Sequence, residues 1–149
     1  MKQPTRQRVA ILGSTGSIGT STLDVLARHP ERFEVHALTA ATQVDLMLQQ
    51  CLQFQPRYAV MASAAHATQL AERLRQAGAK TQVLGGEAAL TEVAAHEEVD
   101  VVMAAIVGAA GLAPCLASAR AGKRLLLANK EALVVGGEFF MQTVRTGGA

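Results

Sequence analysis

A glycine-rich segment near the N-terminus constrains the fold of this chain more than any other feature. The apolar run Val9–Leu12 leads directly into Gly13-Ser14-Thr15-Gly16-Ser17-Ile18-Gly19, and a helical pattern of apolar residues begins at Ile18. A strand, a glycine turn and a helix in this order are typical of a phosphate-binding turn, because glycine lets backbone N–H groups approach an anion. The spacing is G-x-x-G-x-x-G rather than G-x-G-x-x-G, so a tight turn without a ligand stays open as the alternative.

The rest of the chain alternates between short apolar runs and helical patterns. We expect strands at residues 8–12, 33–38, 57–61, 80–84, 99–104 and 124–128. Helices are expected at 17–28, 43–54, 64–77, 87–96, from the loop 105–111 to 121, and at 130–145. Strands separated by helices of this length indicate βαβ crossovers and a parallel sheet. The sequence therefore predicts an α/β fold, a Rossmann-like doubly wound parallel sheet, in a single domain spanning residues 1–149.

Composition limits the class of protein further. Half of the residues are hydrophobic but only 3% are aromatic, so the core is expected to consist of aliphatic side chains. The net charge is +2 with no basic stripe, which argues against a nucleic-acid partner. No apolar run approaches the roughly 18 residues of a membrane span, and the basic start leads into a strand, so we expect a cytoplasmic protein without a membrane partner. Cys51 and Cys115 lack metal or redox spacing and are expected to be reduced core residues.

The loop after the second expected strand bears on the type of cofactor. It contains Thr39-Ala40-Ala41-Thr42-Gln43-Val44-Asp45, with no acidic residue before Asp45 to hold a ribose 2′-hydroxyl. The absence of a carboxylate permits NADPH, although no Arg or Lys is present either. Thr42 and Asp45 fit a capping box, so the helix N-terminus with Thr42 and Gln43 is a candidate phosphate site, and a simple helix cap is the alternative.

Asn129-Lys130-Glu131 follows the last expected strand at the same edge of the sheet. Lys130 is suited to binding a phosphate or polarising a carbonyl, and Asn129 and Glu131 to hydrogen bonds with a carboxamide or ribose. A helix cap at Asn129 with Glu131 in the first turn is compatible with this role, but it does not explain Lys130.

The histidines and one acidic group offer no candidate chemistry in the sequence. His29, His36, His66 and His96 lack metal or catalytic spacing and are expected at the surface or at the ends of elements. Glu97, Glu98 and Asp100 precede a strand, at the edge away from the expected site, and are predicted to form a solvated loop. No metal ligand or catalytic residue is assigned within the chain.

These motifs together resemble one enzyme family, 1-deoxy-D-xylulose 5-phosphate reductoisomerase, and specifically its N-terminal NADPH-binding domain. The resemblance runs through nearly the whole chain, in the stretches 11–19, 21–25, 56–61, 103–112 and 126–131. It implies conversion of 1-deoxy-D-xylulose 5-phosphate to 2-C-methyl-D-erythritol 4-phosphate in non-mevalonate isoprenoid synthesis. It also implies NADPH, a divalent metal (Mg²⁺ or Mn²⁺), a phosphorylated sugar as substrate, and a cytoplasmic homodimer.

The resemblance also assigns individual residues. Gly13, Thr15, Gly16, Ser17 and Ile18 would surround the cofactor pyrophosphate, and Ala41, Thr42 and Gln43 its adenosine end, where many members have a basic residue that this chain lacks. Asn129 and Glu131 would contact NADPH, and Lys130 the substrate. The family's metal-binding Asp-Ser-Glu-His strand, lid and C-terminal helical domain have no counterpart in the sequence, so the chain is expected to bind cofactor without turnover. A homoserine or semialdehyde dehydrogenase-like domain and a stand-alone nucleotide-sensing module are the alternatives.

Overall fold

The computed structural model describes residues 5–106, 111–128, 142 and 145–148. Its strands are β1 (Gln7–Leu12), β2 (Phe33–Ala40), β3 (Tyr58–Met61), β4 (Gln82–Gly85), β5 (Val101–Ala104) and β6 (Arg124–Leu127). Its helices are α1 (Ser17–Arg28), α2 (Val44–Phe54), α3 (Ala64–Gln76), α4 (Glu87–Ala94) and α5 (Leu112–Arg120).

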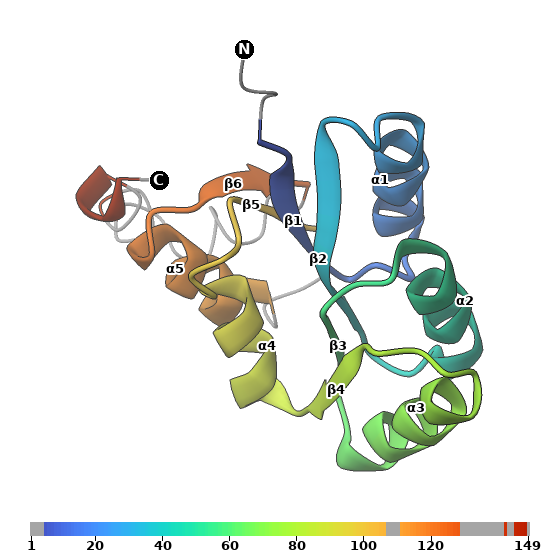
Figure 1. The fold of residues 1–149 in the computed structure, drawn as a ribbon. Helices are drawn as coiled ribbons and strands as arrows, with labels where there is room; N and C mark the ends of the chain where they lie inside the picture. The colour runs from blue at the N-terminus through green and yellow to red at the C-terminus, as the bar shows by residue number, and fades with distance from the viewer. Residues whose placement is uncertain (1–4, 107–110, 129–141, 143–144, 149) are drawn as a thin grey trace.

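These six strands lie in one parallel sheet in the order β4-β3-β2-β1-β5-β6 (Figure 1). The chain progresses outward from β1 to β4 and then returns to β5 on the other side of β1. This reversal between β1 and β5 is the point at which the carboxyl ends of strands in an open α/β sheet usually receive a ligand. The prediction of a Rossmann-like doubly wound sheet is confirmed.

The elements expected from the sequence are present wherever the structure describes them, with small shifts at their ends. One shift affects the site: β2 continues to Ala40, so Thr39 and Ala40 belong to the strand and not to the loop that was expected there. Most of the helix expected at 130–145 lies outside the described residues, and of its span residues 142 and 145 are described and helical.

Helices cover both faces of the sheet, and a separate apolar core lies on each. On one face, Leu23, Met47 and Leu70 from α1, α2 and α3 pack against the sheet. On the other face, Val93 and Cys115 from α4 and α5 do the same. Burying an aliphatic side chain of this size stabilises the fold by about 1.5–3 kcal/mol. Many such side chains can therefore stabilise a core that contains few aromatic residues.

The two cysteines are buried in opposite cores and are not paired. Burial raises the pKa of the Cys51 thiol to about 12 and that of Cys115 to about 11, so both are protonated at neutral pH. This confirms the expectation that they are reduced core residues. Among the described residues, no helix is long and apolar enough to cross a membrane.

Candidate functional site

The turn after β1 is held tightly against β2 and β5. The N–H of Gly13 donates to the carbonyl oxygen and to Oγ1 of Thr39 at 3.1 and 3.0 Å, and the N–H of Ser14 donates to the same carbonyl at 2.8 Å. Gly13 has a φ of +83°, and a Cβ there would lie 2.9 Å from the carbonyl oxygen of Ala105. Glycine at this position is required by the fold itself.

Gly19 has a comparable structural role in α1. A Cβ at Gly19 would lie 2.2 Å from the carbonyl oxygen of Gly13 and 2.7 Å from Cα of Ser14. The absence of a side chain thus lets the first turn of the helix rest directly on the strand-to-helix connection. Two of the three glycines in the motif are explained by packing alone.

Gly16 differs from both of them. Its φ and ψ are −76° and 172°, an extended conformation open to any residue. A Cβ added at Gly16 would have the carbonyl oxygen of Gly13 as its nearest described neighbour, at 3.7 Å. Gly16 is the N-cap of α1 and has no side chain with which to cap this helix end. The backbone at the start of the helix therefore remains accessible to a ligand.

Gly16 lines a cavity of about 370 Å³ at the carboxyl ends of the strands. The cavity is mostly apolar, and among the described residues Glu87, in the first turn of α4, is the one charged residue that lines it. Besides Gly16 and Glu87 it is lined by Gly13, Thr15, Thr39, Ala40, Ala41, Val60, Ala62, Gly86, Leu90, Ala105 and Ile106. A flat apolar ligand with an anionic group fits this lining, because backbone N–H groups rather than cationic side chains would meet the anion.

Buried polar contacts from α2 support the turn from beneath. Nε2 of Gln50 donates to the carbonyl oxygen of Ser14 at 2.9 Å, and the Ser14 hydroxyl lies 3.8 Å from the sulfur of Met47. Ser14 and Gln50 are both buried. Sequence reasoning missed Gln50 as a support of the glycine turn, since only the packing of α2 under the turn reveals it.

The structure brings some of the predicted site residues together and separates others. Gly13, Thr15, Gly16 and Ala41 line the same cavity, and Ser17 and Ile18 form the start of α1 beside it. Thr42 and Gln43 instead line a neighbouring cavity of about 480 Å³ with residues of α3. Asn129, Lys130 and Glu131 lie outside the described residues, as does most of the small-residue segment 105–111.

The predicted capping box at the start of α2 is wrong. The N-cap of α2 is Gln43, which makes no capping hydrogen bond through its side chain, and Thr42 accepts from the N–H of Val44 through its carbonyl oxygen instead of its hydroxyl. The carboxylate of Asp45 pairs with Arg73 of α3 instead of turning back to the helix end. Asp45 thus pairs with the neighbouring helix and does not cap its own.

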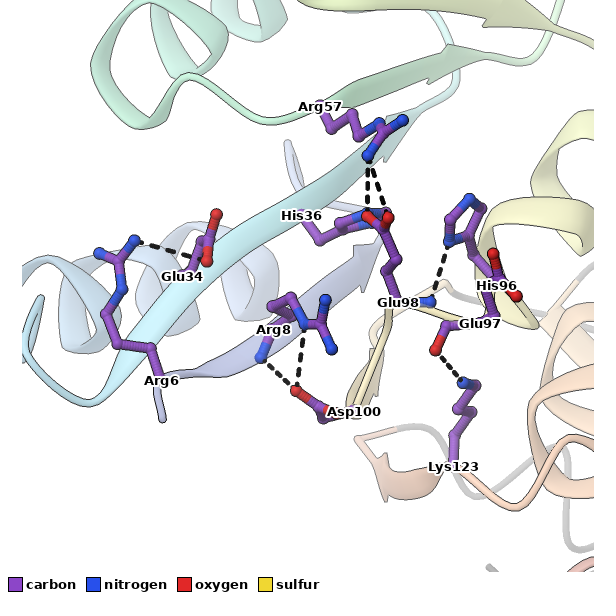
Figure 2. A network of polar contacts seen from close by, with 10 residues as sticks. All are labelled: Arg6, Arg8, Glu34, His36, Arg57, His96, Glu97, Glu98, Asp100 and Lys123. Carbon is purple, nitrogen blue, oxygen red and sulfur yellow. Dashed lines mark hydrogen bonds and ion pairs between the residues drawn. The ribbon is translucent and has the colours of Figure 1, made fainter. Parts of the chain in front are cut away.

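One prediction for the opposite, amino edge of the sheet is also wrong, because His36 is not a surface residue but lies within β2 with only 4% of its surface exposed. Glu97, Glu98 and Asp100 do lie in a loop with exposed or partly exposed side chains, as predicted. Glu98 in addition accepts hydrogen bonds from Arg57 and lies 3.1 Å from Nε2 of His36 (Figure 2). Asp100 likewise accepts from the N–H of Arg8 at 2.8 Å. Strand pairing brings these distant residues together, which local spacing does not reveal.

Comparison with known proteins gives a consistent assignment. The model of the family 1-deoxy-D-xylulose 5-phosphate reductoisomerase matches residues 9–137. A protein of that name from Aromatoleum aromaticum is 63% identical over 98% of this chain, and one from Aeromonas salmonicida is 62% identical over 95%. The chain spans 36% of the length of each of these two relatives.

Solved structures agree with this assignment. A DOX-P reductoisomerase in complex with NADPH, fosmidomycin and magnesium has a TM-score of 0.92 and 48% identity, over 96% of this chain and 35% of its own. The enzyme from Zymomonas mobilis in complex with NADPH has a TM-score of 0.91 and 40% identity, over 97% of this chain and 37% of its own. The dehydrogenase and sensing-module alternatives are not favoured. This chain belongs to the 1-deoxy-D-xylulose 5-phosphate reductoisomerase family.

Proposed function

We propose that residues 1–149 form a single NADPH-binding domain of a 1-deoxy-D-xylulose 5-phosphate reductoisomerase. The cavity at the reversal between β1 and β5 supports this, because dinucleotides bind at this place in doubly wound sheets. Two relatives of similar fold are described in complex with NADPH. In the whole protein, this domain would serve the conversion of 1-deoxy-D-xylulose 5-phosphate to 2-C-methyl-D-erythritol 4-phosphate in a cytoplasmic homodimer.

In this proposal the cofactor lies across the edge of the sheet. Thr15, Gly16, Ser17 and Ile18 would hold the pyrophosphate through backbone N–H groups at the start of α1. Ala41, Thr42 and Gln43 would meet the adenosine end. Asn129 and Glu131 would contact NADPH, and Lys130 would contact the phosphorylated sugar. NADPH supplies the hydride when bound, and a divalent metal (Mg²⁺ or Mn²⁺) would be held by parts of the enzyme outside these residues.

The observation that carries the proposal is the environment of Gly16. The backbone conformation does not require glycine, and no described atom would lie closer than 3.7 Å to a Cβ at this position, yet Gly16 lines the cavity. A side chain there would leave the fold intact while occupying the space through which a pyrophosphate reaches the helix N-terminus. Gly13 and Gly19 cannot serve this test, because substitution at either strains the fold.

Titration calorimetry with NADPH on wild type and Gly16→Val tests the proposal. We expect binding to wild type and at least about tenfold weaker binding to Gly16→Val, equivalent to about 1.4 kcal/mol. The control is Ala71→Val, which introduces the same branched side chain at an exposed position of α3. Circular dichroism establishes that all three proteins are folded. Unchanged NADPH affinity in folded Gly16→Val contradicts the proposal.

A further inference from the structure

The side chains of His36, His96 and Glu98, which are of types that bind metals, lie together at the amino edge of the sheet (Figure 2). The proposed cofactor cavity lies at the opposite edge. His36 belongs to β2, whereas His96 and Glu98 belong to the connection between α4 and β5. One donor atom of each residue lies within 4.8 Å of the others. Within the described part of the chain, this is the one grouping of three such residues.

The geometry of the cluster is close to that of a metal site. Nε2 of His36 and Oε2 of Glu98 are 3.1 Å apart. Two ligands at about 2.0–2.2 Å from a tetrahedral ion are separated by a similar distance. The imidazole rings of His36 and His96 lie 4.9 Å apart between centroids, and Nδ1 of His96 accepts a hydrogen bond from the N–H of Glu98 at 3.1 Å, which coordination through Nδ1 would replace.

The surroundings hold these donors in place. Arg57 donates to both carboxylate oxygens of Glu98 at 3.1 and 2.9 Å, and Tyr58 lies against both imidazole rings. His36 is 4% exposed, and its Nδ1 is buried without a hydrogen-bond partner among the described residues.

We propose that His36, His96 and Glu98 form a binding site for a divalent transition-metal ion of the Zn²⁺ or Co²⁺ class. Two imidazole nitrogens and one carboxylate oxygen are a common ligand set for zinc, whereas Mg²⁺ prefers oxygen ligands only. An adjoining cavity of about 690 Å³, lined in part by His36, Arg57 and Glu98, leaves room for a water molecule as fourth ligand. The site ties β2 to the connection before β5 and is independent of the proposed binding of NADPH.

The test uses the 149-residue chain without NADPH, titrated with Co²⁺. We expect one ion per chain and the intense visible absorption of four-coordinate Co²⁺ with nitrogen and oxygen ligands. His96→Ala and Glu98→Gln each remove one ligand, and each is expected to weaken binding by more than about 100-fold, beyond the loss that a residue outside the coordination sphere causes. His66→Ala is the matched control, because His66 is also half-buried but contacts Ser63 instead of this cluster.

A second measurement does not depend on the variants folding. In wild type, Co²⁺ should shift the NMR signals of the His36 and His96 rings strongly and leave His66 unaffected. Absence of Co²⁺ binding, binding unchanged in His96→Ala or Glu98→Gln, or a tetrahedral signal lost in His66→Ala overturns the proposal. Because NADPH is absent, none of these outcomes bears on the cofactor site.

Discussion

Single residues in this chain differ in whether the packing of the fold requires their side-chain type. Gly13 and Gly19 are required by backbone contacts, whereas Gly16 has room for a side chain and lines the cavity. His36 is a polar residue at a buried strand position that packing alone would fill with an aliphatic side chain. Because its imidazole can bind a proton, the stability of the fold is expected to depend on pH.

We predict that the free energy of unfolding falls as the pH drops below about 6.5, in part because of His36. Its pKa in the folded chain lies below 6.5, so the unfolded chain binds the proton first and acid favours unfolding. One such group contributes at most about 1.4 kcal/mol per pH unit. Urea unfolding of wild type and His36→Gln between pH 7.5 and 5.5 measures this, since glutamine keeps an N–H donor for Glu98 but does not titrate.

The variant should lose less stability than wild type over this range. His66→Gln, which removes a different histidine, serves as the control, and the slope should change more in His36→Gln than in this variant. Parallel stability curves for wild type and His36→Gln would show that His36 is not responsible. His96, Glu98 and Arg57 face His36 and remain unchanged in all three proteins.

At the scale of elements, the connection from β2 to α2 is where we expect the choice between NADPH and NADH to be made. The helix starts at Val44, Gln43 before it does not cap it through its side chain, and Ala41 lines the cavity. The connection has neither an acidic residue to bind a ribose 2′-hydroxyl nor a basic residue to bind a 2′-phosphate. Its polar groups and the positive end of α2 are therefore the features expected to favour NADPH.

We predict that wild type binds NADPH better than NADH by only about 1–2 kcal/mol, the scale of one or two charge-assisted hydrogen bonds. Thr42→Asp should reverse this order, because the carboxylate repels the 2′-phosphate and accepts a hydrogen bond from the 2′-hydroxyl. Thr42→Asn has nearly the same shape without the charge and should keep the order. Calorimetry with both cofactors measures the preference, and a wild type that prefers NADH would contradict this interpretation.

At the scale of the whole molecule, the distribution of charged side chains bears on whether this chain can hold a catalytic metal ion. The grouping of three metal-ligand residues in the described part of the chain lies at the amino edge, whereas the cavity lies at the carboxyl ends of the strands. Glu87 is the only charged residue among the described residues that line the cavity. A catalytic Mg²⁺ requires several oxygen ligands near the substrate, and the carboxyl edge does not offer them within the described ranges.

We therefore predict that the 149-residue chain does not oxidise NADPH when given 1-deoxy-D-xylulose 5-phosphate and Mg²⁺ or Mn²⁺. The ultraviolet absorbance of NADPH follows the reaction, with saturating substrate and metal. The relative from Aromatoleum aromaticum, assayed under the same conditions, is the positive control. Metal-dependent turnover by the 149-residue chain would mean that the catalytic ligands lie within it.

The local features of this protein follow from its sequence without knowledge of the packing. The run from Val9 to Gly19 predicts a strand, a turn and a helix, and alternation of short apolar runs with helical patterns predicts a parallel α/β sheet. These predictions succeeded because hydrophobic periodicity and glycine turns act over a few residues. The glycine turn predicted a phosphate site that includes Gly13, Thr15 and Gly16, and the family resemblance added Ala41; the structure places these four around one cavity.

Which distant residues meet depends on the tertiary structure instead. The strand order placed the reversal between β1 and β5 and so brought Ala105 beside the glycine turn. It also buried His36 next to Glu98, which is 62 positions away in the chain, and α3 supplied the Arg73 that draws Asp45 from its predicted cap. Such contacts depend on how strands and helices pack across the sheet, and no periodicity within one segment encodes the partner in another.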